Sequence, residues 1–228
     1  MFEKLPKKEV EHIDPEIVEK VEALNLDWNE KGELLLVEGG IKPATFISFD
    51  IRIWQEGEEP SILKTEEDVK NFFETIGQMN VLSQPIPREI KVEEQGQKNR
   101  HEKKWRKIKV FHDHTGVYIG STRENLNRLV EAITSGDHEL IGKALGYPPT
   151  AVEAFMGKRT RLDLKKISKE ILLGDGMTFL TPTLSRDNWQ NEIKTGEEYA
   201  QFLKKEAPEI YKLIMEKRRK TLRMWGLL

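Results

Sequence analysis

Residues 45–54 read TFISFDIRIW, and the strict alternation in this stretch decides the fold class that we expect. Ile47, Phe49, Ile51 and Ile53 fall on one face of an extended chain, which predicts a β-strand with a buried side. The other face mixes aromatic side chains with an acid and a base, so we expect it to be half exposed or covered by a helix. A sheet should therefore form around this strand.

Three other stretches predict strands: ELLLVE at 33–38, PIPREIKVEE at 85–94 and WRKIKVF at 105–111. The prolines of the second stretch stand at its start, where a missing N–H group is tolerated. Between the last two strands, residues 94–104 are polar and have no hydrophobic period, which predicts an exposed loop.

The stretch after residue 111 predicts a hairpin followed by a capped helix. Asp113-His114-Thr115-Gly116 combines residue types of a tight turn, and VYIG at 117–120 would return as the partner strand. Ser121 and Glu124 have the spacing of a capping box, in which each side chain satisfies an orphan backbone N–H group. The helix that follows would end at residues 135–136.

Helical spacing of apolar residues dominates the remaining sequence. The predicted helices are 15–24, 65–77, 138–145, 149–155, 162–173, 195–206 and 208–224, with a glycine-punctuated loop at 174–185. The fold class is therefore α+β, with an antiparallel sheet and flanking helices in residues 1–121 and a mostly helical, basic part in residues 122–228. The boundary between them is either a domain boundary or a change of layer within one domain.

Charge is distributed unevenly along the 228 residues. The net charge is −2, yet residues 1–97 carry 11 basic and 22 acidic side chains, whereas residues 98–228 carry 26 and 17. Such a split predicts either that the second part meets a polyanion or that the two parts attract each other.

The composition excludes several classes of site. The chain contains no cysteine, which excludes disulfides, thiolate metal sites and a cysteine nucleophile. No apolar run approaches a membrane span, and the first 16 residues lack the apolar core of a secretory signal, so we expect a cytoplasmic protein. Phosphate-binding and dinucleotide-binding glycine motifs are absent, and no cofactor is expected. Asp50 beside Arg52 favours a structural ion pair over a catalytic acid.

Three basic clusters in the second part predict contact with nucleic acid. The first, KNRHEKKWRKIK at 98–109, places seven Lys and Arg and one Glu around a tryptophan, which suits phosphate contacts and base stacking. The others are GKRTRLDLKK at 157–166 and EKRRKTLRMW at 216–225. We expect the three clusters to form one positive surface. The alternative is that each cluster is a solvated face or a helix end, because these give the same run of basic residues in the sequence. The residues assigned to this surface are Arg100, Lys103, Lys104, Trp105, Arg106, Lys107, Lys158, Arg159, Arg161, Arg218, Arg219 and Arg223.

His112 and His114 suggest a metal site, because histidines two apart on a strand share a face. The turn predicted at 113–116 would spoil that face, and no third ligand is evident. The alternative is a pair of turn-region histidines that hydrogen-bond the backbone or water.

Tyr118-Ile119-Gly120 followed by Arg128 resembles the second half of the GIY-YIG endonuclease signature. The resemblance implies a nuclease in which Tyr118 assists the nucleophile, Arg128 stabilises the phosphate charge, and Glu139 or Glu153 holds a divalent metal. The first half of the signature is absent, since IKVFHDHTG stands in its place. A sheet tyrosine and a solvated arginine are the structural alternative.

The stretch LGYPPTAVEAF at 145–155 is similar to a group of uncharacterised archaeal and bacterial proteins with a Leu-Gly-Tyr-Pro motif. In that group a cysteine pair follows the motif, and Thr150 and Ala151 stand in its place here. The resemblance covers roughly residues 110–156 and implies a prokaryotic protein, no particular activity, and the loss of any role of the thiols.

Three functional hypotheses follow. The first is a non-enzymatic protein associated with nucleic acid or ribonucleoprotein, which holds RNA or DNA on its basic C-terminal half. The second is a metal-dependent phosphodiesterase that uses Tyr118, Arg128 and a glutamate. The third is a scaffold whose charged parts meet a protein partner or a second copy of the chain.

Overall fold

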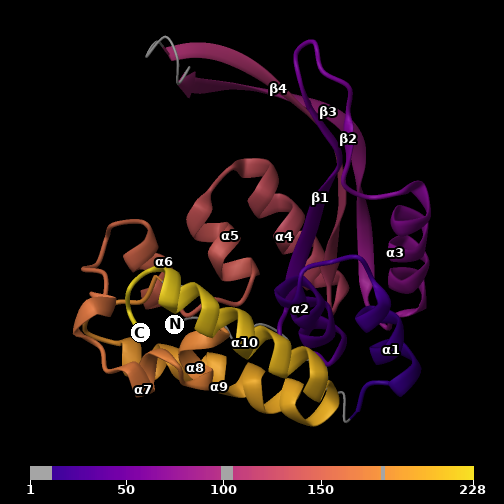
Figure 1. Ribbon diagram of the computed structural model, residues 1–228. Coiled ribbons are helices and arrows are strands. Elements are labelled where there is room, and N and C mark those ends of the chain that lie inside the picture. Colours follow the sequence, from indigo (N-terminus) through magenta and orange to yellow (C-terminus); the bar gives the residue numbers. More distant parts are fainter. Residues whose placement is uncertain (1–11, 99–104, 181–182) are drawn as a thin grey trace.

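Four antiparallel strands form a long sheet in the order β2-β1-β4-β3 (Figure 1). The computed structural model describes residues 12–98, 105–180 and 183–228. Within these residues the strands are β1 (Ala44–Gln55), β2 (Ser61–Ile62), β3 (Leu82–Lys98) and β4 (Trp105–Gly120). Helices flank the sheet and make up most of the chain after β4, so the α+β class predicted from the sequence is confirmed.

β4 runs without interruption through the stretch predicted to turn, so the hairpin expected at 113–116 is wrong. His114 pairs with Asp50 on β1 and with Glu89 on β3, which places this stretch in the middle of the sheet. Gly116 lies there because the strands approach closely: an added Cβ would come within 2.2 Å of the Ile47 carbonyl oxygen.

β3 is longer than predicted. It continues to Lys98, past the strand end expected at residue 94, and pairs there with Trp105 of β4. The expected loop at 94–104 is therefore strand in its first half. Residues 99–104 of that loop lie outside the described residues.

A β-bulge in β1 between Asp50 and Arg52 changes which side chains share a face. Phe49 pairs with Thr115 before the bulge, and Arg52 pairs with Asp113 after it. Because positions 113 and 115 lie on the same face of β4, Arg52 lies on the face of Phe49. The predicted alternation therefore holds only as far as the bulge, and Asp50 and Arg52, expected to form an ion pair, lie on opposite faces.

α3 (Glu66–Gln78) covers one face of the sheet. Thr65 and Asp68 form a capping box at its start. Phe72 contacts Phe49 of β1 edge to face, with ring centroids 5.2 Å apart. The helix therefore buries the Phe49 side of the sheet, which the alternation in β1 predicted to be buried.

α4 (Arg123–Ser135) packs on the opposite face, beside the end of β4. Its N-cap is Thr122, which accepts a hydrogen bond from the N–H group of Asn125 at 3.2 Å, so the cap predicted at Ser121 is wrong by one residue. The Ser121 hydroxyl instead donates to the carbonyl of Pro43 at 3.0 Å. This bond ties the start of the helix to the segment that leads into β1.

The stretch 33–38, predicted as a strand, belongs to the helix α2 (Trp28–Glu38) instead. Asp27 and Glu30 form a capping box at its start. Residues 34–37 are all buried, because β1 and other helices surround this helix. A helix that is apolar all round shows no 3.6-residue period, which is why its sequence looks like a strand.

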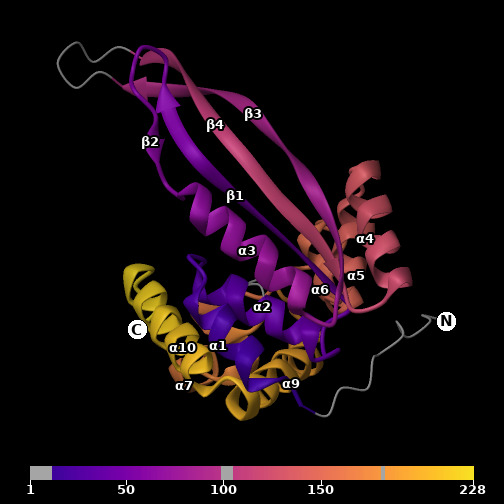
Figure 2. The same cartoon turned by 90° about the vertical axis from the view of Figure 1, so that its right-hand side faces the viewer.

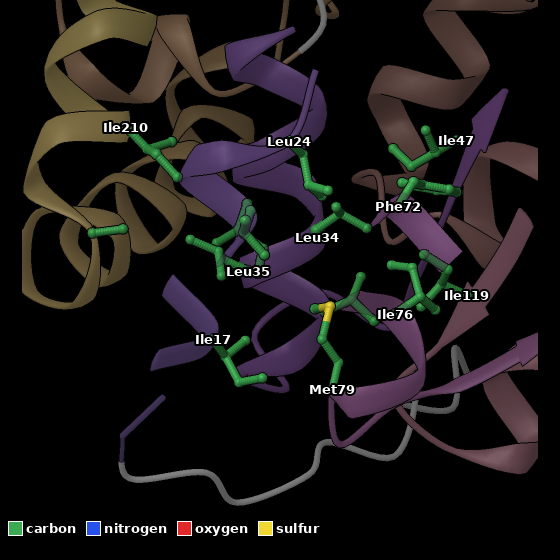
Figure 3. Packing of buried hydrophobic residues seen from close by; sticks show 14 of the residues in the cluster. Ile17, Leu24, Leu34, Leu35, Ile47, Phe72, Ile76, Met79, Ile119 and Ile210 are labelled. Atoms are coloured by element: carbon green, nitrogen blue, oxygen red, sulfur yellow. The ribbon is translucent and has the colours of Figure 1, made fainter. Parts of the chain in front are cut away.

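The largest core lies between the sheet and a layer of helices from both ends of the chain (Figure 3). We call α1 (Pro15–Ala23), α2, α9 (Trp189–Glu206) and α10 (Pro208–Met224) the helical layer. Leu35 of α2 and Ile210 of α10 belong to the same buried cluster as the sheet residues. The core thus draws on both sides of the boundary expected at residue 121.

A smaller set of helices connects α4 to the helical layer. These are α5 (His138–Ala144), α6 (Pro149–Phe155), α7 (Lys169–Leu172) and α8 (Asp175–Thr178). The long helix predicted at 162–173 is wrong, because Asp163 and Ser168 each cap a new short turn and divide it. The loop predicted at 174–185 contains α8, and residues 181–182 lie outside the described residues.

Candidate functional site

β3 and β4 form a two-stranded ribbon that extends beyond the rest of the sheet. β1 pairs with β4 only as far as Val110, whereas β3 pairs with it as far as Lys98 and Trp105. Among the described strands, residues 94–98 and 105–109 therefore pair with each other alone, over a length of about 17 Å. Figures 1 and 2 both show this end of the ribbon projecting past the described helices.

The described residues of the first basic cluster, Lys98 of β3 and residues 105–109 of β4, lie at the end of this ribbon. Residues 98–107 contain six Lys and Arg and one Glu. Of the assigned residues, Arg100, Lys103 and Lys104 lie outside the described residues, and Trp105 and Arg106 belong to β4 with only their backbone described. The end of the ribbon thus contains Lys98, Arg106 and Lys107, the described cations of residues 98–107.

Acids from the first part of the chain accompany the described lysines of the ribbon. Lys107 pairs with Glu94 of β3 at 3.0 Å, and Lys109 lies 3.7 Å from Glu56. All four side chains are about half exposed or more, so these pairs are weak and open to competition by other anions. The attraction between acidic and basic parts, an alternative left open by the sequence, occurs here.

One face of the sheet beside the ribbon is apolar and exposed. Val92, Phe111 and Trp54 are register neighbours across three strands, and the rings of Trp54 and Phe111 stack with centroids 5.3 Å apart. Ile62, Ile90 and Val92 on this face are 67%, 61% and 53% exposed. We call these five side chains the apolar face. It offers ring and aliphatic surface to a base or to a partner protein.

A charged network lies between the apolar face and α3. Arg88 of β3 donates Nε and Nη2 to the two carboxylate oxygens of Asp113, each at 2.8 Å, and Nη1 to Glu66 at 3.2 Å. These hydrogen bonds lower the pKa of Asp113 below its ordinary value. Sequence reasoning missed the network, because a second bulge between Ile86 and Glu89 sets the register that brings it together.

The assigned residues of the second basic cluster already have partners. Their contacts are the ion pairs Lys158–Glu139, Arg159–Glu153 and Arg159–Asp187, and the hydrogen bonds from Arg161 to the carbonyls of Ala154 and Phe155. Hydrogen bonds from Lys143 and Lys158 lower the pKa of Glu139 to about 2. Arg161 completes the C-terminal end of α6, where carbonyl groups need donors.

The third basic cluster, at the end of α10, divides between surface and interior. Arg219 and Arg223 are exposed, whereas Arg218 is half-buried and Lys217 pairs with Asp27 before α2. Figures 1 and 2 both place the C-terminal end of α10 well away from the end of the ribbon. The first and third clusters therefore do not share the single surface that we expected.

His112 and His114 share a face of β4 with Asp50 of β1. Nδ1 of His112 donates to Asp50 at 2.9 Å, since a carboxylate only accepts, and Nδ1 of His114 lies 3.5 Å from the other Asp50 oxygen. Within the described ranges, no group of three or more His, Cys, Asp or Glu is placed to hold a metal ion. The contacts orient both imidazole rings against the sheet.

The four residues of the nuclease resemblance have different neighbours. Glu139, one of the two acids named to hold the metal, pairs with Lys143 and Lys158. Tyr118 packs against the buried cluster beneath α4. Arg128 pairs with Glu124 one turn earlier on that helix, and Glu153 pairs with Arg159. Among the residues that the structure describes, no hydrogen bond or ion pair joins Tyr118, Arg128 and Glu153.

None of the described helices is both long and apolar enough to cross a bilayer. No protein-family model, no curated protein and no solved structure matches the chain. The function of this chain must therefore be inferred from its own side chains and their arrangement.

Proposed function

We propose that this protein binds nucleic acid through the end of the β3–β4 ribbon, with the phosphate backbone as the main contact. One observation supports the proposal: Lys98, Arg106 and Lys107, which belong to the most basic stretch of the sequence, lie on the two strands at the end of a ribbon that projects past the described helices. Two strands spaced by about 4.8 Å fit a DNA major groove about 12 Å wide. The same ribbon also has the extended shape needed to bind along single-stranded RNA or DNA.

The balance of charge favours the ribbon over the other basic clusters. Residues 98–107 carry a surplus of five positive charges, from six Lys and Arg against one Glu. By contrast, Lys158 and Arg159 already pair with neighbouring carboxylates, which a phosphate would have to displace. Phosphate contacts are therefore expected on the ribbon first.

The apolar face supplies a second kind of contact close to the phosphate-binding end. Trp54 and Phe111 are stacked on the two central strands, within the same sheet as the ribbon. Stacking of a base on an aromatic side chain contributes about 1–3 kcal/mol, largely regardless of sequence. We therefore expect binding without a strong preference for base sequence.

The test is fluorescence anisotropy with labelled single-stranded and double-stranded RNA and DNA at increasing KCl. If about five cations contact duplex phosphates, the logarithm of affinity falls with the logarithm of salt at a slope of about −4.5, because each contact contributes about −0.9. The affinity would then drop several hundred-fold between about 50 and 200 mM KCl. A flat salt response would contradict the proposal.

Charge-removal variants locate the contact. The ribbon variant Lys103→Gln, Lys104→Gln and Arg106→Gln should make the slope less steep by about 2.7. The matched control, Lys158→Gln, Lys165→Gln and Lys166→Gln, removes the same number of charges outside the ribbon and should leave the slope unchanged. Equal effects of the two variants would mean non-specific attraction and would exclude the ribbon as the site.

A protein partner is the second candidate, and the apolar face favours it. Ile90 and Val92 are exposed on β3, which is an edge strand of the described sheet and so also presents backbone groups to a further strand. Light scattering at two salt concentrations tests for a second copy of the chain. Ile90→Lys should reduce a dimeric mass to the monomeric one. A monomeric mass in both salts would exclude self-association by this face.

A further inference from the structure

A cavity of about 290 Å³ lies among α2, α9 and α10 in the helical layer. Leu36, Leu203 and Ile214 provide part of an apolar wall, and Glu33, Lys217 and Arg218 bring charge to it. Ligand pockets range from roughly 300 to 1,000 Å³, so this cavity suits a small molecule. A mixture of apolar walls and a few converging polar groups is typical of such sites.

Arg218 brings buried, unpartnered donor atoms to the lining of this cavity, as far as the structure describes it. Its Nε and Nη2 atoms are buried and have no hydrogen-bond acceptor in the described part of the chain. Burial lowers the pKa of this guanidinium, but arginine remains protonated throughout the physiological range. Buried N–H groups of a cation without acceptors are unfavourable, and oxygen atoms of a ligand would supply those acceptors.

The position of Arg218 along α10 explains why the side chain turns inward. Ile214 and Leu222 lie four residues before and after it, and both are buried. Residues spaced by four lie on the same face of a helix, so Arg218 stands in an otherwise apolar row. Its neighbour Arg219 is exposed.

The other charged groups at the cavity are balanced. Lys217 pairs with Asp27, and Glu33 pairs with the buried Lys42. Among the described residues that line the cavity, Arg218 thus leaves one positive charge uncompensated, which a monoanion would neutralise. The planar guanidinium of Arg218 matches the two oxygen atoms of a carboxylate.

We propose that this cavity binds a small organic monocarboxylate, with its carboxylate on Arg218 and its apolar body against Leu36, Leu203 and Ile214. The proposal is independent of nucleic-acid binding, since α10 and the end of the ribbon lie apart (Figure 2). Tyr147, from the Leu-Gly-Tyr-Pro stretch, also lines the cavity and links that stretch to the site.

Titration calorimetry and thermal unfolding of the full chain with acetate, hexanoate, phenylacetate, hexanol and inorganic phosphate test the proposal. Hexanoate and phenylacetate should bind more tightly than acetate, because they bury more apolar surface. Hexanoate should also bind at least about tenfold more tightly than hexanol, which lacks the charge that Arg218 requires. Equal binding of hexanol and hexanoate, tighter binding of phosphate, or no carboxylate binding at millimolar concentration would overturn the proposal.

Two variants and a matched control assign the contact. Arg218→Met should weaken hexanoate binding at least about tenfold, since it removes the charged donors. Arg219→Met removes the neighbouring exposed arginine and should leave binding unchanged. Thr221→Phe, which fills part of the cavity and keeps Arg218, should also weaken binding. This variant tests the cavity even where Arg218→Met folds poorly. Hexanoate binding that is unchanged in both Arg218→Met and Thr221→Phe would exclude this cavity.

Discussion

Lys42 forms an ion pair with Glu33 in the interior: the Lys42 side chain is 1% exposed, and its Nζ donates a hydrogen bond to Glu33 Oε2. Glu33 also accepts from the Thr45 hydroxyl at 3.1 Å, and the Tyr147 ring lies 5.3 Å from Nζ. Burial alone lowers the pKa of Lys42, but Glu33, Tyr147 and Tyr199 together outweigh burial and raise it above its ordinary value. Lys42 therefore stays charged and ties α2 to the segment before β1.

Removal of one partner should cost more than removal of both. Lys42→Met leaves the Glu33 carboxylate without its counter-ion and should lower the free energy of unfolding by about 3 kcal/mol. The double variant Lys42→Met and Glu33→Gln should recover a large part of that loss. Urea unfolding measures both. Lys212→Met, at an exposed pair with Glu209, is the control and should change stability by less than about 0.5 kcal/mol. Additive losses in the double variant would contradict a coupled pair.

Substitution of two glycines by alanine should change the stability of the protein in opposite directions. Gly116→Ala should destabilise the protein by about 2 kcal/mol or more, because its Cβ would overlap the β1 backbone, 2.2 Å from the Ile47 carbonyl oxygen. Gly77→Ala in α3 meets no atom within 4 Å and should stabilise by up to about 1 kcal/mol through helix propensity. Thermal unfolding of both variants measures these two changes in stability. A neutral Gly116→Ala would mean that β1 and β4 do not pair this closely.

The Arg88–Asp113 contact should make stability depend on pH in acid. Hydrogen bonds from Arg88 hold the pKa of Asp113 below its ordinary value, so the folded protein binds this proton less readily than the unfolded chain. The stabilisation is complete above the unfolded pKa of about 4 and is lost as the pH falls through the lower, folded pKa. Arg88→Gln should raise the pKa of Asp113, measurable by NMR titration of its carboxyl carbon.

The same variant gives a thermodynamic check of that contact. The difference in unfolding free energy between the natural protein and Arg88→Gln should be largest near neutral pH and should close in strong acid. Arg123→Gln, at an exposed arginine on α4, should show no such trend. A difference that stays constant from pH 7 to strong acid would show that Arg88 does not stabilise the ionised form of Asp113.

Elements with one exposed side were predictable from the sequence, and those enclosed on several sides were not. α3 and α10 were predicted because their solvent faces carry charge between the apolar residues. α2 lost its period because residues 34–37 are all buried. β4 looked like a turn because its central residues include Asp113 and Thr115, which are buried through partners far away in the sequence. Local patterns do not contain such pairings.

The candidate sites divide in the same way. The basic character of the ribbon end is a local property and was predicted, but its projection depends on where β1 stops pairing with β4. The Arg88–Asp113 contact depends on two bulges, which no sequence pattern marks. Arg218 had a signal that went unused: a cation four residues from Ile214 and four from Leu222 lies on the buried face of its helix. The spacing places Arg218 on the buried face of α10, whereas its charge alone suggested the surface.

Glu192 should be the most sensitive acid in α9, because three donors converge on it. Its side chain is 1% exposed and accepts hydrogen bonds from the Thr150 hydroxyl and from the hydroxyl and N–H groups of Ser185, the last at 2.9 Å. Glu192→Ala leaves these buried donors without an acceptor, so we expect a loss of about 3 kcal/mol or more in the free energy of unfolding. Glu197→Ala, at an exposed position on the same helix, should change it by less than about 0.5 kcal/mol. Amide hydrogen exchange adds a local readout, since the Ser185 N–H group should lose protection in Glu192→Ala and keep it in the control. Full protection at Ser185 in Glu192→Ala would show that another group holds this segment against α9.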